Sequence, residues 1–395
     1  MRVQRMGLGL GLVALAATSA CVNEGQADAA NGPVRKGGDD RTGEYELVEH
    51  WWKPAPNHGD AWTWGSIAAV GTDGPNRIFA TAWGDRPAPA PGQAPAPGQG
   101  RRVRMQNLIT VYDGNGNLIE NWSQWDTIMT EPHRIMVDPY DPERHVWVVD
   151  LGMQGAYEQV LKFSNDGKQL VLHMRDPEKQ LTQEEQRAKF PNPGPLDFGM
   201  PSVIAFLPDG HFLLGDGYWN GRIAKYTTDG EFVSQFGSVG SGPGQFDLIH
   251  GIAVDPAGRI LVADRRNSRI QVFTSAGEFI EEWPDIHDPV NIYIDENEAV
   301  WVADGTLNRI LKYSLDGELL DYFGAYGKIS SLGRPGLNCP DQETVCGGFA
   351  LPHNFDVDSE GNLYIAQYSG PWVDKLVPRA GADPTRLIGQ PLRLN

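Results

Sequence analysis

Cysteine is scarce in this chain of 395 residues, which contains only three. This scarcity excludes a disulfide-dense scaffold and a structural zinc site built from four thiolates. Two of the three, Cys339 and Cys346, stand in the segment CPDQETVC. We expect them to close one small disulfide loop in an oxidising compartment; metal binding by the pair is the alternative, although it lacks the further cysteines that a thiolate site needs.

Positive charge is also in short supply, because 33 basic residues face 51 acidic ones and the formal net charge is -18. Such a chain is repelled by a nucleic-acid backbone and by an anionic membrane surface. We therefore expect no nucleic-acid partner and contact with a membrane only through a lipid anchor. A small molecule or a peptide is the expected substrate, and we expect a monomer.

No apolar run at the N-terminus is long enough to span a bilayer. Arg2 and Arg5 precede the short run GLGLGLVALAA, which ends in TSAC at Cys21. This pattern predicts an export signal over residues 1–21, with Cys21 as the lipidated residue of a cell-envelope lipoprotein on the periplasmic side. Plain secretion is the alternative. Residues 22–43 are small and polar, which predicts a flexible tether.

Turn formers are abundant, with 47 Gly and 29 Pro, and they separate short apolar strands. Self-similar units of four such strands predict an all-β fold, a six-bladed β-propeller over residues 44–395. The six first strands begin with SIAAVG, HRIMVD, SVIAFL, HGIAVD, VNIYID and HNFDVD. The isolated segment YELVEHWW, residues 45–52, looks like a fourth strand without the other three. Joined to the last blade, this N-terminal strand would close the ring.

Histidine starts every second one of these strands. In order, the first residues are Ser66, His133, Ser202, His250, Val290 and His353. The first strand of each propeller blade lines the central channel, so the three imidazoles are expected to meet on the axis. Three neutral imidazoles with an open fourth position are typical of catalytic zinc, although copper, nickel or iron also accept such ligands. The alternative is that each histidine only packs or makes hydrogen bonds.

Residues that follow the second strand of a blade are expected near the mouth of the channel. In the third and fourth blades these segments are GDGYWNGRI and ADRRNSRI. Tyr218 is therefore a candidate acid or base, and Arg265 a candidate clamp for a substrate carboxylate. The alternative is that Tyr218 only packs and that Arg265 makes a structural ion pair. Arg222 and Arg269 recur within the repeat and are assigned to its scaffold.

Five segments, taken in order, resemble the peptidyl-α-hydroxyglycine α-amidating lyase family. They are EPHRIMVD, DGYWNGRI, IHGIAVD, VADRRNSRI and LPHNFDVD, and the segment around His250 resembles an NHL repeat. The resemblance covers about residues 44–377 and implies a six-bladed NHL propeller that cleaves an α-hydroxyglycine into an amide and glyoxylate. It implies His133, His250 and His353 as zinc ligands, Tyr218 as the catalytic base and Arg265 as an active-site arginine.

Two positions depart from the family pattern. Trp83, in ATAWGDRP, stands where the family has an arginine, and Arg86 is the nearest replacement. Asn354 follows the third histidine, where the family has an aspartate that resembles a calcium ligand beside backbone carbonyls near Ala68 and Ile135. A possible Ca²⁺ site at these residues is weakened or lost, because asparagine offers only a neutral oxygen.

The sequence thus predicts a zinc-dependent carbon–nitrogen lyase acting on an α-hydroxyglycine-like amide. A metal-assisted hydrolase of an ester or lactone would use the same ring of histidines. The third hypothesis is a non-catalytic NHL propeller that binds protein or glycan in the cell envelope. The alternating histidines favour catalysis over this non-catalytic hypothesis.

Overall fold

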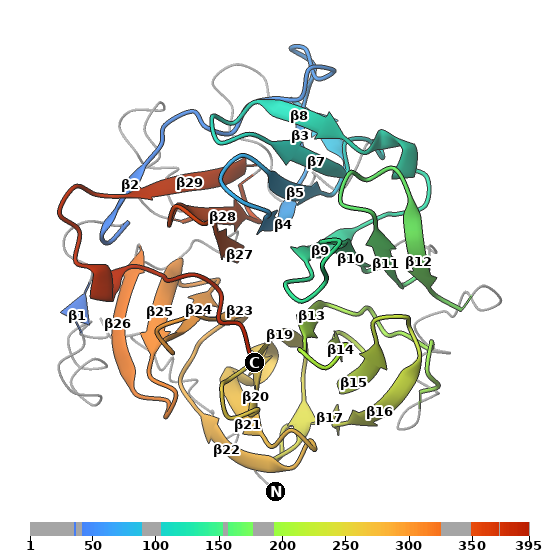
Figure 1. The fold of residues 1–395 in the computed structure, drawn as a ribbon, viewed down its shortest axis with the longest axis vertical. Coiled ribbons are helices and arrows are strands. Elements are labelled where there is room, and N and C mark those ends of the chain that lie inside the picture. The colour runs from blue at the N-terminus through green and yellow to red at the C-terminus, as the bar shows by residue number, and fades with distance from the viewer. Residues whose placement is uncertain are drawn as a thin grey trace, which may run out of the picture. The chain divides into compact units, whose positions relative to one another are not determined.

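Six four-stranded antiparallel blades surround a central axis in a computed structural model of the chain (Figure 1). The structure describes residues 35–36, 42–88, 104–152, 157–176, 193–324, 349–370 and 372–394. All of these fall in one unit, Arg35–Asn395. The prediction of an all-β six-bladed propeller is confirmed. Cys21, Cys339 and Cys346 lie outside the described residues, so the lipidation and disulfide assignments stay predictions.

The blades follow one another along the chain. Blade 1 contains β4 (Ile67–Thr72), β5 (Ile78–Ala82), β7 (Ile109–Tyr112) and β8 (Leu118–Asn121). Blade 2 contains β9 (Pro132–Val137), β10 (Val146–Asp150), β11 (Gln159–Phe163) and β12 (Leu170–Met174). Blade 3 contains β13 (Val203–Phe206), β14 (His211–Asp216), β15 (Arg222–Thr227) and β16 (Phe232–Phe236). Blade 4 contains β19 (Ile249–Val254), β20 (Ile260–Asp264), β21 (Arg269–Phe273) and β22 (Phe279–Trp283). Blade 5 contains β23 (Pro289–Ile294), β24 (Val300–Asp304), β25 (Arg309–Tyr313) and β26 (Leu319–Gly324).

Blade 6 is closed by a strand from the N-terminal part of the chain, as the sequence predicts. Its strands are β27 (Pro352–Val357), β28 (Leu363–Gln367), β29 (Trp372–Pro378) and, antiparallel to β29, β2 (Tyr45–Leu47). The strand is shorter than the segment YELVEHWW, because the chain turns at His50, whose φ is 57°. Closure of this kind pairs the outer edge of the last blade and removes an exposed edge.

Five short strands and three short helices lie outside the blades. They are β1 (Arg35–Lys36), β3 (Trp62–Trp64), β6 (Asp85–Pro87), β17 (Ser238–Val239), β18 (Gln245–Phe246), η2 (Ser123–Trp125), η3 (Arg265–Asn267) and η4 (Pro384–Arg386). β1 pairs in parallel with β26 and lies inside the segment that we expected to be a flexible tether. No helix among the described residues has the length and apolar character needed to cross a membrane.

The blades share a scaffold that joins their second and third strands. The buried aspartates that end β14, β20 and β24 accept hydrogen bonds from an arginine at the start of the next strand. The pairs are Asp216 with Arg222 at 2.8 Å, Asp264 with Arg269 at 2.9 Å and Asp304 with Arg309 at 2.9 Å. The assignment of Arg222 and Arg269 to the scaffold of the repeat agrees with these contacts.

The inner strands carry a bulge at the position that faces the axis. In β9 the pairing to β10 skips His133, and in β19 and β27 it skips His250 and His353. The same irregularity skips Ala68 in β4 and Val290 in β23. Ala68, rather than Ser66, is therefore the blade 1 equivalent of the histidines. Our sequence alignment of blade 1 was wrong by two residues, because the stretch IAAVG that follows Ser66 has no histidine or other polar residue to fix its register. A bulged residue is not paired within its own sheet, which leaves its polar groups available for other contacts.

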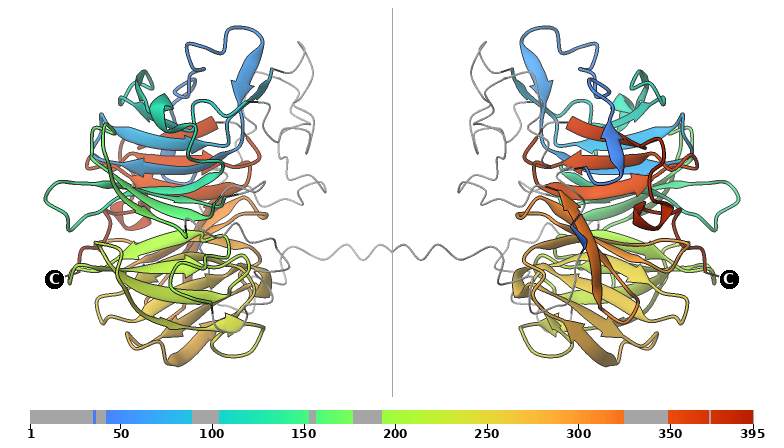
Figure 2. Two further views of the ribbon diagram at one scale, coloured as in Figure 1. Left: turned by 90° about the vertical axis from the view of Figure 1, so that its right-hand side faces the viewer. Right: turned by 90° about the vertical axis from the view of Figure 1, so that its left-hand side faces the viewer.

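The C-terminal segment runs inward over blade 5 and ends near the centre of the ring, on one face of the propeller (Figures 1 and 2). The Leu392 amide donates to the carbonyl of Ile294 at 2.9 Å, and the Leu394 amide donates to the hydroxyl of Tyr140 at 2.9 Å. Tyr140 follows β9 in blade 2, whereas Ile294 ends β23 in blade 5. The tail thus spans from blade 5 to blade 2 and covers one end of the channel.

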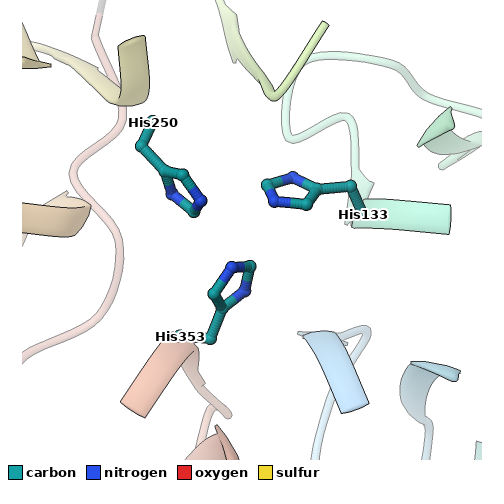
Figure 3. Close-up of side chains that lie close together, drawn as sticks. All are labelled: His133, His250 and His353. Atoms are coloured by element: carbon teal, nitrogen blue, oxygen red, sulfur yellow. The ribbon is translucent and has the colours of Figure 1, made fainter. Parts of the chain in front are cut away.

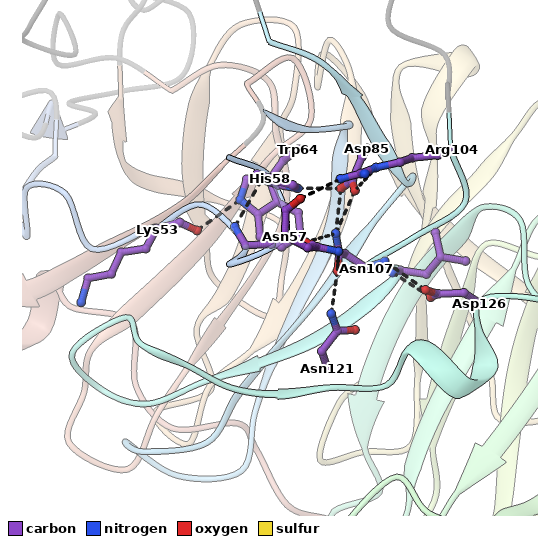
Figure 4. A network of polar contacts seen from close by, with 11 residues as sticks. Lys53, Asn57, His58, Trp64, Asp85, Arg104, Asn107, Asn121 and Asp126 are labelled. Carbon is purple, nitrogen blue, oxygen red and sulfur yellow. Dashed lines mark hydrogen bonds and ion pairs between the residues drawn. The ribbon is translucent and has the colours of Figure 1, made fainter. Parts of the chain in front are cut away.

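A buried polar network fixes the first blade to the segment that precedes it (Figure 4). His58 Nε2 donates to Asp85 Oδ1 at 2.7 Å, since His58 Nδ1 accepts from the amide of Ala55. Arg104 Nε and Asn107 Nδ2 donate to the same carboxylate at 2.8 and 2.9 Å. His58 lies in a turn, yet it is only 2% exposed.

We expect Asp85→Ala to lower the free energy of unfolding by about 3–5 kcal/mol, the cost of removing one partner from a buried ion pair. The physical reason is that His58 and Asn107 would keep buried donors without an acceptor. Urea denaturation followed by tryptophan fluorescence measures the change. Asp166→Ala is the control, because the Asp166–Lys168 pair is solvent-exposed and its loss should leave the midpoint nearly unchanged. Equal midpoints for both variants would contradict this prediction.

Candidate metal centre

Three histidines from alternate blades converge on the propeller axis (Figure 3). His133, His250 and His353 lie in the inner strands β9, β19 and β27, and they are 0%, 0% and 2% exposed. One ring nitrogen of each lies within 4.8 Å of those of the other two. Among the described residues, this is the group of histidine, cysteine and acidic side chains placed closely enough to hold one metal ion. The tertiary structure therefore brings the predicted ligands together.

Backbone carbonyls of the intervening blades orient all three rings. His133 Nδ1 lies 2.9 Å from the Ser202 carbonyl and His250 Nδ1 lies 2.7 Å from the Val290 carbonyl. His353 Nδ1 lies 2.6 Å from the Ala68 carbonyl. These acceptors occupy the same inner-strand position in blades 3, 5 and 1, so each histidine contacts the next blade. A carbonyl only accepts, so each Nδ1 carries the proton and each Nε2 keeps its lone pair free.

Burial keeps these imidazoles neutral. Desolvation, together with the positive charge of Arg134, lowers the pKa of His133 to about 3. Desolvation and the neighbouring histidines hold the pKa values of His250 and His353 well below their usual range. Neutral imidazoles with Nδ1 bonded to a carbonyl are the state in which histidine binds a transition metal. The residues therefore fit the zinc ion that the sequence predicts.

Tyr218 lies directly beside two of the candidate ligands. It follows β14 and Gly217, and its hydroxyl is 3.2 Å from Nε2 of both His133 and His250. Burial raises the pKa of the Tyr218 phenol, while the charges of Arg265 and Arg134 oppose this rise. The phenol thus stays protonated at neutral pH unless further positive charge is present. The structure places Tyr218 where the sequence predicted an acid or base.

Arg265 starts the short helix η3 after β20. Its contacts are compatible with both roles that the sequence left open, a structural ion pair and a clamp for a substrate carboxylate. Its Nε donates to Asp288 Oδ1 at 2.6 Å, which is the structural ion pair. Burial tends to lower the pKa of Arg265, but the charge and hydrogen bond of Asp288 outweigh it and raise the pKa. Arg265 also lines a cavity beside the histidine ring, so part of its guanidinium remains available to a ligand.

A cavity of about 330 Å³ opens beside the histidine ring. Its apolar and aromatic wall consists of Trp83, Leu151, Met200, Leu248, Leu351 and Tyr368. Its polar lining consists of Glu131, Tyr218, Arg265, Arg266, Asp288 and His353. Trp83 packs edge-on against Tyr368, which in turn stacks on His353 with ring centroids 5.1 Å apart. The sequence suggested Arg86 as a replacement for the family arginine whose position Trp83 occupies. Arg86 lies in β6 and is not among the described residues that line the cavity.

The sequence pattern assigned no role to three residues that line the cavity, Glu131, Asp288 and Tyr368. Tyr368 follows the second strand of blade 6, as Tyr218 and Arg265 follow those of blades 3 and 4. The same positional rule, applied to blade 6, predicts this residue at the mouth of the channel. Glu131 and Asp288 precede the inner strands of blades 2 and 5. Glu131 opens the segment EPHRIMVD, in which only the histidine was assigned a role, and Asp288 lies in none of the five segments.

Comparison with known proteins supports the same family. An NHL repeat model matches residues 246–273. NHL repeat-containing protein 3 of Homo sapiens is 29% identical over 278 residues, which are 68% of this chain and 72% of that protein. Peptidyl-alpha-hydroxyglycine alpha-amidating lyase 1 of Drosophila melanogaster is 26% identical over 319 residues, which are 72% of this chain. This NHL-repeat propeller is a homologue of the amidating lyases.

The relationships differ in how much of each protein they cover. The match to the Drosophila lyase spans 51% of that protein. Among solved structures, that of streptogramin B lyase aligns with a TM-score of 0.51 at 15% identity, covering 85% of this chain and 98% of the other. At this identity the likeness shows the fold alone. The activity of the NHL-repeat propeller therefore has to be argued from its own site.

The oxygens of the possible calcium site already have partners in this propeller. The Ala68 carbonyl accepts from His353 Nδ1, and Asn354 Oδ1 accepts from the amide of Val70 at 2.7 Å. Ile135 lies in β9, two residues after His133, and lines a second cavity together with Asn354. Calcium binding at these residues stays a prediction.

Proposed function

We propose that the protein is a zinc-dependent lyase that cleaves the carbon–nitrogen bond of an α-hydroxyglycine-like amide and releases an amide and glyoxylate. The observation that carries this proposal is the position of the Tyr218 hydroxyl, 3.2 Å from two of three convergent imidazole Nε2 atoms. A ring of histidines with a phenol at its open side is suited to catalysis rather than to structure. The homology to amidating lyases supports the reaction type.

His133, His250 and His353 would hold the zinc ion through Nε2. When bound, zinc supplies a Lewis acid that polarises a substrate oxygen and a positive charge that favours the ionised form of the adjacent phenol. The protein contributes the orientation, because the carbonyls of Ser202, Val290 and Ala68 fix each ring before any ion arrives.

The other residues of the cavity bind the substrate and move its proton. Arg265 and Arg266 offer positive charge to a carboxylate, and the apolar wall at Trp83 and Leu351 accepts the blocked side of the amide. Tyr218, as the phenolate, takes the proton of the substrate hydroxyl. The C–O bond then becomes the carbonyl of glyoxylate, the C–N electron pair leaves with the amide nitrogen, and that nitrogen takes up one proton.

The direct test is to incubate purified protein with an N-acyl-α-hydroxyglycine and to quantify glyoxylate and the matching primary amide. We expect both products in equal amounts, with activity lost on chelation and restored by zinc. If neither product forms with metal-loaded protein, the lyase proposal is wrong.

Two other functions use features of the same molecule. The cavity that suits a hydroxylated amide would also admit a small ester or lactone, and a metal-assisted hydrolase would release an acid and an alcohol instead. The similarity to NHL repeat-containing protein 3 leaves room for a non-catalytic propeller. Product analysis on both substrate types distinguishes a lyase from a hydrolase. A folded, stable protein that turns over neither substrate would favour the non-catalytic alternative.

A further inference from the structure

Arg134 occupies the layer of the channel directly next to the histidine ring. It follows His133 in β9, and its equivalents in blades 5 and 6 are Asn291 and Asn354, which follow Val290 and His353. The side chain of Arg134 is among the largest fully buried ones in the described chain. A positively charged group therefore lies near the axis, in a place where other propeller blades carry neutral residues.

Two oxygens from other blades bind this guanidinium. Arg134 Nη1 donates to Asn291 Oδ1 at 3.1 Å, and Nη2 donates to the backbone carbonyl of His250 at 3.0 Å. These acceptors belong to β23 and β19, so one side chain ties blade 2 to blades 4 and 5. The backbone of the candidate ligand His250 is thus held from the blade that carries the candidate ligand His133.

The charge on Arg134 has no acidic counterpart at contact distance. No ion pair within the described part of the chain involves Arg134, whereas the scaffold arginine Arg222 pairs with Asp216 at 2.8 Å. A guanidinium is protonated throughout the physiological pH range, so Arg134 carries its positive charge. Its Nε is buried and makes no hydrogen bond. A buried cation that is held only by neutral oxygens resembles a metal ion bound by carbonyl ligands.

The same region is where the family resemblance implies calcium. Arg134, Ile135, Asn291 and Asn354 line one cavity of about 230 Å³, which the C-terminal segment covers. Calcium takes six to eight oxygens, usually including carboxylates. Here the oxygens of His250 and Asn291 accept from Arg134, and those of Ala68 and Asn354 accept from other N–H groups.

The carboxylate of Asp356, which also lines this cavity, already has hydrogen-bond donors. It accepts from the amide and the hydroxyl of Thr72 at 2.7 and 3.0 Å. A divalent ion would have to share these oxygens with their present donors and would be repelled by the positive charge of Arg134. The residues present therefore do not fit calcium.

We propose that Arg134 is the resident cation of the channel: its guanidinium takes the place of a calcium ion and holds the strands that carry His133 and His250 at the spacing of the metal centre. Arg134 is a positioning residue, because it touches the backbone of one histidine and follows the other in sequence. The protein accordingly needs no calcium.

The first experiment measures calcium directly and does not depend on the lyase activity. Metal-free wild-type protein is dialysed against calcium with magnesium as the comparison, and its bound calcium and thermal midpoint are measured. We expect no stoichiometric calcium and no calcium-specific rise of the midpoint. The double variant Arg134→Leu, Asn354→Asp removes the cation and restores a carboxylate, and we expect it to gain a calcium-dependent midpoint. Stoichiometric calcium in the wild type, or no gain in the folded double variant, would overturn the replacement of calcium by Arg134.

The second experiment tests the positioning role through zinc affinity, measured by competition with a chromogenic chelator. We expect Arg134→Met to bind zinc about 10–100-fold more weakly, the range for loss of a group that supports metal ligands. Arg134→Lys keeps the charge but not both hydrogen bonds, so we expect an intermediate loss. Arg222→Met is the matched control, since Arg222 is equally buried at 2% but belongs to the outer scaffold of blade 3.

The outcomes of the zinc experiment separate the proposals. Equal zinc affinities for Arg134→Met, Arg222→Met and wild type would overturn the positioning role. If Arg134→Met does not fold, the Arg134→Lys variant decides by the same criterion. Absence of zinc binding by the wild type would overturn the metal centre itself and with it the positioning role, while the calcium result would still stand or fall on its own.

Discussion

Replacing His250 with alanine is expected to abolish glyoxylate release and to weaken zinc binding by more than the roughly 100-fold that loss of an outer-shell partner costs. The physical reason is that two imidazoles cannot complete a facial three-nitrogen site, and among the described residues no further histidine, cysteine or acidic side chain joins this group. Tyr218 would also lose one of its two imidazole neighbours. Zinc content by mass spectrometry and glyoxylate release on one preparation measure both effects.

His287→Ala is the matched control for this substitution. His287 is an exposed histidine in the loop before β23, so its loss should leave zinc content and turnover unchanged. Wild-type zinc affinity in His250→Ala would show that the ion, if present, lies elsewhere. Turnover retained without zinc would remove the metal from the mechanism.

The second large effect is expected on kcat when the hydroxyl of Tyr218 is removed. We expect Tyr218→Phe to lower kcat by about 10²–10⁴-fold, the usual contribution of a positioned acid or base. Zinc affinity and KM should change little, because phenylalanine keeps the ring that packs in the cavity and removes only the hydroxyl that approaches His133 and His250. Steady-state kinetics on the hydroxyglycine substrate separate kcat from KM.

Tyr293→Phe serves as the comparison for the loss of one tyrosine hydroxyl. Tyr293 lies in β23, its hydroxyl donates to the Gly389 carbonyl at 3.0 Å, and we expect its loss to leave kcat unchanged. A Tyr218→Phe variant as active as the wild type would assign the proton transfer to another group. Glu131, which lines the same cavity, would then be the next residue to examine.

The linear sequence was sufficient to predict most of the architecture. Alternating apolar residues bounded by turn signals, repeated six times, determine six blades, because each unit can bury its apolar face only against its neighbours. The isolated segment at Tyr45 predicted the closing strand for the same reason, since an unpaired edge in blade 6 required a partner. The alternating histidines followed from this register, which is why the ligands could be named from strand order alone.

The register itself could be wrong where local signals were weak. In blade 1 the inner strand consists of small apolar residues, and our alignment placed Ser66 where the structure has Ala68. That error hid the rule that each histidine donates to the carbonyl of the equivalent residue in the next blade. A bulge is set by the pairing of two strands, so one strand read alone does not reveal it.

The sequence by itself thus determined the propeller, its closure and the three histidines that meet on its axis, because these depend on periodic patterns that short segments carry. Only the tertiary structure decided the tautomers of those histidines, the ion pair of Arg265 with Asp288 and the burial of His58. It also showed that the guanidinium of Arg134 already occupies the channel. The physical reason is that such contacts join residues from different blades, up to 285 positions apart, as for His353 and Ala68. Their strength depends on distance and desolvation, and both arise only when the ring has closed.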